Sequence, residues 1–130
     1  VDVMEAKQHD YILSITSHIP HLIAYNIVNT SLNIQDEKKS EIVKYSAGGL
    51  RDFTRIAASN PIMWRDIFIH NKKNTSEMIS KFIINLENLK KAIENEDGKQ
   101  LEEIFLKTKK IRKNIIEAGQ DVEKPNFGRK

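Results

Sequence analysis

The most constraining feature of the sequence is the periodicity of its last third. Apolar residues recur every three or four positions in two runs separated by Asn95-Glu96-Asp97-Gly98. This spacing puts apolar side chains on one face of an α-helix. Helices joined by so short a turn form an antiparallel hairpin, and Asp97 with Gln100 is typical of a capping box. The runs contain Ile79, Phe82, Leu86, Leu89 and Ile93, then Leu101, Ile104, Phe105, Thr108, Ile111 and Ile115.

Helical spacing also dominates the rest of the chain, and strand-like alternation is almost absent, so we predict an all-α fold. Pro20 lies inside an apolar run from about Asp2 to Ser31. Because proline cannot donate a hydrogen bond to the Thr16 carbonyl, we expect a kink or a break there. A second helix is expected from about Asp36 to Tyr45.

Two further helix starts are predicted in the middle of the chain. The segment Ser46-Ala47-Gly48-Gly49 interrupts the helical pattern, and Asp52 is expected to be the N-cap of a short helix. Asn60 is expected to cap the next helix, with Pro61 at its first position. The two stripes of the hairpin are too wide to bury against each other, so further helices or a second copy of the chain must cover them.

Composition and charge exclude several classes of protein. The 130 residues include no cysteine, which removes thiol chemistry and zinc ribbons. The 21 basic and 18 acidic residues interleave, so we expect no nucleic-acid binding. No apolar run approaches the roughly 20 residues needed to span a bilayer, which favours a cytoplasmic protein without a membrane segment. Residues 121–130 are expected to be a flexible basic tail. Since no N-cap precedes the first helix, the chain is expected to be cut from a longer one.

The segment 17–21, Ser-His-Ile-Pro-His, is the first candidate site. Ser17 and His21 are four residues apart and share a helix face. Three interpretations remain open: a ligand-binding site, a hydrogen-bonded structural histidine, or a metal site. A metal ion would need further ligands, and only His9 and Asp10 lie nearby in the sequence.

The second candidate site is the segment 48–55, Gly-Gly-Leu-Arg-Asp-Phe-Thr-Arg. A helix N-terminus with Arg51 and Arg55 within about one turn would suit a carboxylate or a phosphate. The alternative is a local ion pair between Asp52 and Arg55. The segment is not a Walker loop, because the Gly-Lys-Ser/Thr ending is missing. Trp64, on the next helix, is either a core residue or part of a site.

Taken together in this order and spacing, these segments resemble prephenate dehydrogenases. More narrowly, the chain is similar to the cyclohexadienyl (prephenate or arogenate) type of bacterial tyrosine biosynthesis. The resemblance covers about residues 1–120. It rests on His9-Asp10, the segments 17–21, 48–57 and 60–67, and Asn71-Lys72.

The resemblance implies that residues 1–120 are the C-terminal helical domain, which interlocks into a homodimer and completes the substrate pocket. The N-terminal Rossmann domain, which binds NAD or NADP, is absent from this chain, so the isolated chain is expected to bind no cofactor and to be inactive. The whole enzyme would oxidatively decarboxylate prephenate to 4-hydroxyphenylpyruvate, or arogenate to tyrosine. The competing interpretation is a stand-alone helical dimer that binds an anionic metabolite as a regulatory module.

The resemblance also implies roles for individual residues, none of them catalytic or metal-binding. Arg55 would clamp a substrate carboxylate and His21 would hydrogen-bond the polar end of the substrate. Trp64 would close the pocket from the partner subunit, although Arg55 and Trp64 are close enough in sequence to face one local pocket. Arg51 stands where relatives have lysine. The implied substrate-binding set is Ser17, His21, Gly48, Arg51, Asp52, Arg55 and Trp64.

Overall fold

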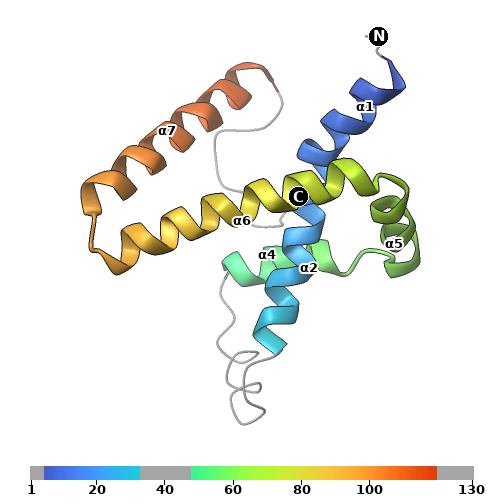
Figure 1. Ribbon diagram of the computed structural model, residues 1–130, viewed down its shortest axis with the longest axis horizontal. Helices are drawn as coiled ribbons and strands as arrows, with labels where there is room; N and C mark the ends of the chain where they lie inside the picture. The colour runs from blue at the N-terminus through green and yellow to red at the C-terminus, as the bar shows by residue number, and fades with distance from the viewer. Residues whose placement is uncertain (1–4, 33–47, 120–130) are drawn as a thin grey trace. The chain divides into compact units, whose positions relative to one another are not determined.

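A computed structural model describes residues 5–32 and 48–119, and every regular element in these ranges is a helix (Figure 1). The predicted all-α fold is therefore confirmed. The predicted helix 36–45 and the predicted tail 121–130 lie outside the described residues. The elements are α1 (Ala6–Leu13), the π-helical turn η1 (Ser14–His18), α2 (Ile19–Leu32), α4 (Gly48–Ala57), α5 (Pro61–His70), α6 (Lys72–Glu94) and α7 (Gly98–Glu117).

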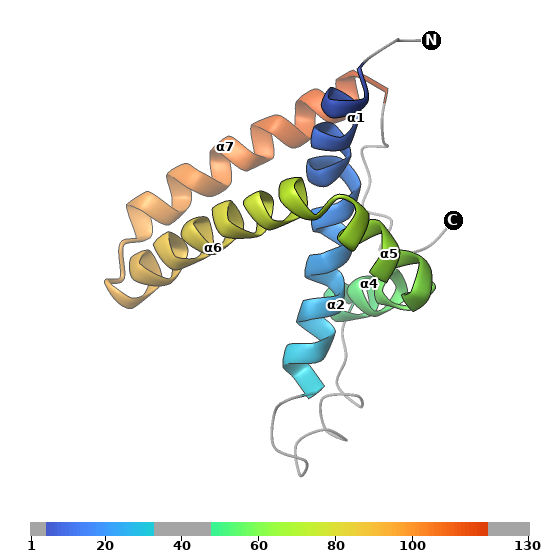
Figure 2. The same cartoon turned by 45° about the vertical axis from the view of Figure 1, so that its right-hand side comes forward.

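The helix does not break at Pro20, contrary to one of the two outcomes expected there. Instead, η1 precedes it, and the backbone N–H of Ile19 donates to the Ser14 carbonyl, five residues back. A π-turn adds one residue to a helical turn. This accommodates Pro20, which has no N–H and would otherwise interrupt the regular hydrogen bonds of an α-helix. The elements α1, η1 and α2 consequently follow one another as one column (Figure 2).

Helix α4 begins at Gly48, four residues before the predicted N-cap, Asp52. The two glycines lie in its first turn and Asp52 lies inside the helix, so the prediction of Asp52 as an N-cap is wrong. Glycine disfavours a helix interior by only about 1 kcal/mol relative to alanine. Here α4 packs against α2, and the Tyr25 hydroxyl donates to the Ser59 carbonyl at 2.9 Å. These tertiary contacts outweigh the local preference of the two glycines.

Helix α5 starts as the sequence predicts. The Asn60 side-chain oxygen accepts from the backbone N–H groups of Ile62, at 3.0 Å, and Met63, at 3.2 Å. Pro61 occupies the first turn, where its missing N–H costs nothing. The three-residue connection 58–60 brings α5 back toward the helices that α4 already contacts.

The chain divides inside α6, between Ile79 and Ser80, into two compact units. In the second unit, α7 returns antiparallel to α6 and the two helices diverge from the turn, as Figures 1 and 2 show. The predicted hairpin is therefore present. The Asp97 side chain accepts from the Gln100 N–H at 3.1 Å. The reciprocal half of the capping box is missing because the Asp97 N–H already bonds the Ala92 carbonyl at 2.8 Å.

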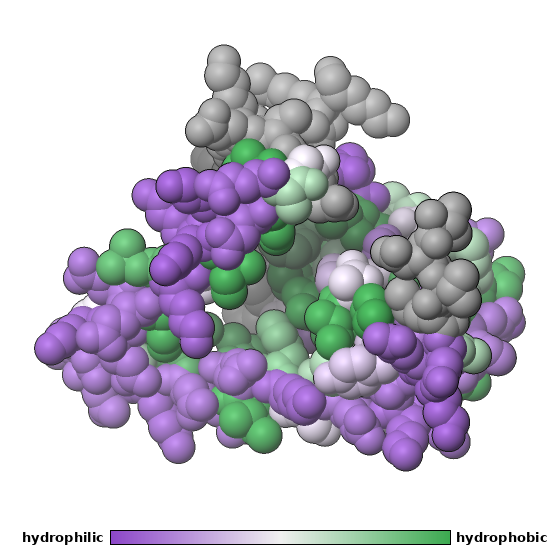
Figure 3. Space-filling model, turned by 90° about the horizontal axis from the view of Figure 1, so that it is seen from above, coloured by the Kyte–Doolittle hydropathy of each residue, from purple (hydrophilic) through white to green (hydrophobic). Residues whose placement is uncertain are grey.

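The hairpin does not bury its own apolar faces. Among residues 80–119 the structure buries only Ala92, while Ile93, Phe105 and Ile111 are 62%, 56% and 53% exposed. Apolar side chains also reach the surface among charged ones in the space-filling view (Figure 3). The described part of this unit thus lacks a core of its own, as the width of the two stripes predicts.

Candidate functional site

A stack of aromatic rings joins two of the segments identified in the sequence. His21 of α2 lies flat on Trp64 of α5, with ring centroids 3.9 Å apart and an interplanar angle of 18°. His18 stands nearly perpendicular to the same indole, at 6.2 Å and 83°, and Phe68 packs at 5.4 Å. Trp64 is 7% exposed. Residues some 40 positions apart in sequence therefore meet in one cluster within the first unit.

The structure describes one chain, so closure of a partner subunit's pocket by Trp64 stays a prediction. Trp64 stacks on His21 of its own chain. The cause is the short connection after α4, because α4 packs on α2 and α5 begins at Pro61, directly after it. The alternative, in which Arg55 and Trp64 face one local pocket, likewise stays a prediction.

His21 offers a hydrogen-bonding atom to a ligand. Its Nδ1 lies 2.8 Å from the Ser17 carbonyl, which can only accept, so Nδ1 carries the proton. In the neutral ring Nε2 is then an acceptor, and it has no partner among the residues that the structure describes. Ser17 thus orders the site through its backbone, on the helix face that it was predicted to share with His21.

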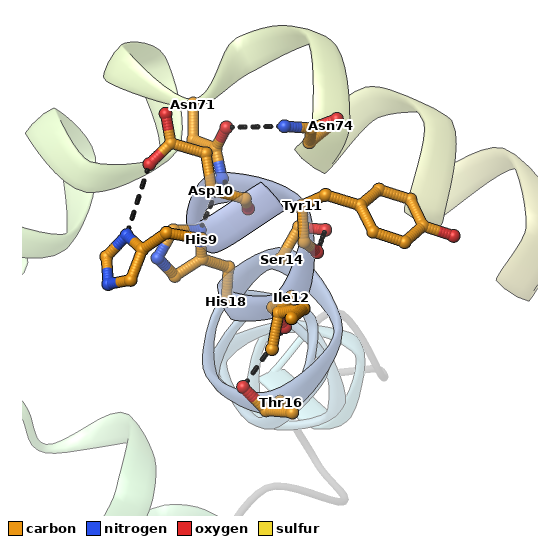
Figure 4. A network of polar contacts seen from close by, with 9 residues as sticks. All are labelled: His9, Asp10, Tyr11, Ile12, Ser14, Thr16, His18, Asn71 and Asn74. Atoms are coloured by element: carbon orange, nitrogen blue, oxygen red, sulfur yellow. Dashed lines mark hydrogen bonds and ion pairs between the residues drawn. The ribbon is translucent and has the colours of Figure 1, made fainter. Parts of the chain in front are cut away.

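His18, by contrast, is a buried histidine held by protein groups. It is 8% exposed, and its Nδ1 lies 3.2 Å from Nδ2 of Asn71 (Figure 4). Of the three interpretations for segment 17–21, a hydrogen-bonded structural histidine describes His18. In the described ranges, no three His, Cys, Asp or Glu side chains gather as a metal site would require.

Burial lowers the pKa of His18, because desolvation penalises the imidazolium. The carboxyl of Asp10 opposes this shift, while His21 and His9 add to it. The pKa of His18 in the folded chain therefore lies below its ordinary value of 6.5.

Stability is consequently expected to fall as the pH drops below 6.5. The unfolded chain takes up a proton at His18 there and the folded chain does not, so unfolding is favoured by up to about 1.4 kcal/mol per pH unit. Above pH 6.5, His18 is neutral in both the folded and the unfolded chain, so its contribution to the free energy of unfolding is fully present. Urea unfolding at a series of pH values between 8 and 5.5 measures how the free energy of unfolding depends on pH. His18→Asn should flatten the curve and His70→Asn, at an exposed position, should not; equal curves for both variants would contradict the assignment.

The arginines of α4 are available to a ligand. Arg51 and Arg55 are exposed and Asp52 is half-buried. The alternative of a local Asp52–Arg55 ion pair is not found, since neither guanidinium group has a hydrogen bond or ion pair with the described part of the chain. Gly48 is half-buried at the start of the helix. No hydrogen bond, ion pair or ring contact joins these arginines to the stack among the described residues.

Sequence reasoning assigned no role at the site to Phe68 or to Asn71, although Asn71 belongs to the segments that carry the resemblance. Phe68 completes the aromatic cluster, and Asn71 bonds across 61 residues to the Asp10 carbonyl. Asn71 resembles an ordinary helix terminus in the sequence, and it is indeed the C-cap of α5. Two buried polar atoms, Nε1 of Trp64 and Oγ1 of Thr75, have no hydrogen-bond partner in the described structure. Such atoms call for an explanation, and a ligand or a water is the usual one.

Comparison with known proteins gives a consistent result. Residues 5–107 match the family model described as prephenate dehydrogenase, dimerization domain. A cyclohexadienyl dehydrogenase of Zymomonas mobilis is 38% identical over 86% of this chain, and a prephenate dehydrogenase of Bacillus subtilis is 35% identical over 86%. The chain covers only 38% and 30% of these two relatives.

Solved structures agree with the sequence relatives. Prephenate dehydrogenase from Aquifex aeolicus, in complex with hydroxyphenyl propionate and NAD+, is 40% identical with a TM-score of 0.81. The match covers 88% of this chain and 40% of that one. Synechocystis arogenate dehydrogenase shares the fold, with a TM-score of 0.81 at 18% identity over 87% of this chain and 41% of that one. None of the described helices has the length and apolarity needed to span a bilayer. The chain belongs to the prephenate dehydrogenase family, and residues 5–107 correspond to that family's dimerisation domain.

Proposed function

We propose that this chain is the dimerising and substrate-binding part of a cytoplasmic prephenate or arogenate dehydrogenase of tyrosine biosynthesis. In the whole enzyme a separate N-terminal Rossmann domain would bind NAD or NADP. The observation that carries this proposal is the His21–Trp64 stack, in which His21 Nε2 and Trp64 Nε1 both lack protein partners among the described residues. The family match supplies the chemistry that such a site would serve.

The substrate's charge suits the cations that the chain presents. Prephenate carries two carboxylates, and an arginine can grip a carboxylate with two parallel N–H···O bonds. We assign this role to Arg55, whose guanidinium has no counter-ion in the described structure. Arg51 is a second cation one turn earlier, where its charge adds to that of the helix N-terminus at Gly48. Asp52, between them, completes the polar surface of this turn.

His21 and Trp64 would hold the other end of the ligand. His21 accepts at Nε2 from a ligand hydroxyl, and its ring is held in place by the Ser17 carbonyl. Trp64 offers its indole N–H to an acceptor, and its stacking on His21 leaves both side chains little freedom. The A. aeolicus relative binds hydroxyphenyl propionate, an aromatic carboxylate, which supports a ligand with one polar ring and one acid group.

The chain's contribution to the reaction would be orientation. When bound to the separate N-terminal domain, the nicotinamide cofactor would supply the acceptor for a hydride from the ring carbon that carries the hydroxyl, and loss of the ring carboxylate as CO2 would restore aromaticity. The residues of this chain need only hold the ring in place, which lowers the barrier through positioning. We also propose that a second copy covers the exposed apolar faces of the hairpin, because the matched family model is a dimerisation domain.

The activity is tested on the full-length product of the gene. Purified enzyme should reduce NAD or NADP when supplied with prephenate or arogenate, with the rise of absorbance at the reduced cofactor's band as the readout. Assays with each substrate and each cofactor give the preference. The isolated chain should neither bind the cofactor nor reduce it, and serves as the control. A folded full-length dimer that is inactive with all four combinations would overturn the proposal.

A further inference from the structure

A buried amide, Asn71, lies at the centre of the polar network beside the aromatic stack. It is 7% exposed at the junction of α5 and α6. Its side chain bonds the Asp10 carbonyl at 2.8 Å, His18 Nδ1 at 3.2 Å and Asn74 Nδ2 at 3.0 Å (Figure 4). These partners come from α1, η1 and α6, so one side chain links three elements.

The chemistry of these partners determines which way Asn71 points. A backbone carbonyl can only accept, so the NH2 group of Asn71 faces Asp10 and its oxygen faces the Asn74 amide. The second hydrogen of the same NH2 group then points at His18 Nδ1. His18 must accept at Nδ1, which places its proton on Nε2 and keeps the ring neutral. A proton on Nδ1 would meet the N–H of Asn71.

The orientation of His18 in turn affects the stack. Its ring is nearly perpendicular to Trp64, an arrangement that favours contact between the edge of one ring and the face of the other. Trp64 lies flat on His21. Since Asn71, His18 and Trp64 are only 7%, 8% and 7% exposed, rotation of one of these side chains displaces the next.

We infer that Asn71 is a positioning residue, which through His18 holds Trp64 flat against His21 and so orients the two side chains that bind the ligand. The effect on ligand binding rests on the proposed function, whereas the geometry of the network does not. The other titratable groups near His18 are the carboxyl of Asp10 and the rings of His9 and His21. They affect the charge of His18 but do not bond its Nδ1 in the described structure, so Asn71 alone selects the tautomer.

The test uses Asn71→Asp, which keeps the size of the side chain and replaces the donor with a carboxylate. His18 should then bind a proton at Nδ1, and its pKa should rise by about one unit or more. Nitrogen NMR of the imidazole measures the tautomer and the titration. Trp64 is the only tryptophan in the sequence, so its fluorescence reports directly on the stack and should change with the ionisation of His18. Asn88→Asp, at an exposed position of α6, is the matched control and should alter neither signal.

In the full-length enzyme, Asn71→Asp should raise the KM for prephenate about tenfold, because His21 and Trp64 are then held less well in the orientation that binds the ligand. A tenfold change corresponds to about 1.4 kcal/mol of binding free energy. The KM for the cofactor should stay unchanged. The inference is overturned if wild-type His18 carries its proton on Nδ1, a measurement that needs no variant to fold. It is also overturned if Trp64 fluorescence is the same in Asn71→Asp and Asn88→Asp. An inactive wild-type enzyme would refute the proposed function alone, since the NMR and fluorescence results would still decide the role of Asn71.

Discussion

Replacing Arg55 with alanine is expected to raise the KM for prephenate ten- to a hundredfold in the full-length enzyme, with the KM for NAD nearly unchanged. Arg55 is exposed and its guanidinium has no ion-pair partner in the described structure, so its loss breaks no ion pair there. A charge-assisted hydrogen bond to a carboxylate contributes about 1.5–3 kcal/mol, which gives this range. Steady-state kinetics with each substrate varied in turn measures both constants.

Two further variants separate carboxylate binding from general charge effects. Arg55→Lys keeps the charge and loses the two-pronged geometry, so its KM should fall between those of wild type and Arg55→Ala. Arg65→Ala removes another exposed arginine, one that is paired with Asp66 at 2.9 Å, and should leave the KM for prephenate unchanged. Equal effects of Arg55→Ala and Arg65→Ala would show that Arg55 acts only through net charge.

Replacing Ile111 with aspartate is expected to convert the proposed dimer into a monomer at micromolar concentration. Ile111 lies in the apolar stripe of α7 and is 53% exposed in the single chain. In a two-fold dimer the substitution occurs twice at the interface. If each buried, unpaired carboxylate costs about 2 kcal/mol, the dissociation constant rises about a thousandfold.

Sedimentation measures the change, and circular dichroism checks that the helices persist. Lys110→Gln changes the net charge by the same amount at an exposed position outside the apolar stripe of α7, where it should leave the dimer intact. A wild-type chain that sediments as a folded monomer, or an Ile111→Asp variant that remains dimeric, would show that a second copy does not cover this stripe.

The local features of the fold were predictable because they depend on a few neighbouring residues. The three- and four-residue spacing of apolar side chains predicts α6 and α7, and the caps at Asn60 and Asp97 form with backbone groups two or three positions away. Free energies of such contacts depend little on the rest of the molecule. The same holds for Ser17 and His21, whose shared helix face follows from helical geometry.

The errors arise where distant contacts compete with local preference. The two glycines before Leu50 suggest a helix break, yet α4 includes them and packs on α2. Of the kink or break expected at Pro20, the break does not occur, and a π-turn precedes the proline. In each case the local cost is a few kcal/mol at most, a magnitude that packing against another helix can offset.

The candidate site itself depends on contacts between residues far apart in sequence. The helical pattern places Trp64 on a helix but cannot say which rings it meets, and nothing local indicates that Asn71 bonds His18, 53 residues away. Such pairs form only when the chain connections between α2, α4 and α5 bring the helices together. Residue type and spacing therefore identified the segments of the candidate site. The tertiary structure determined which of their side chains contact one another. Contacts between residues far apart in sequence depend on how the helices pack, and the neighbouring residues in the sequence do not determine them.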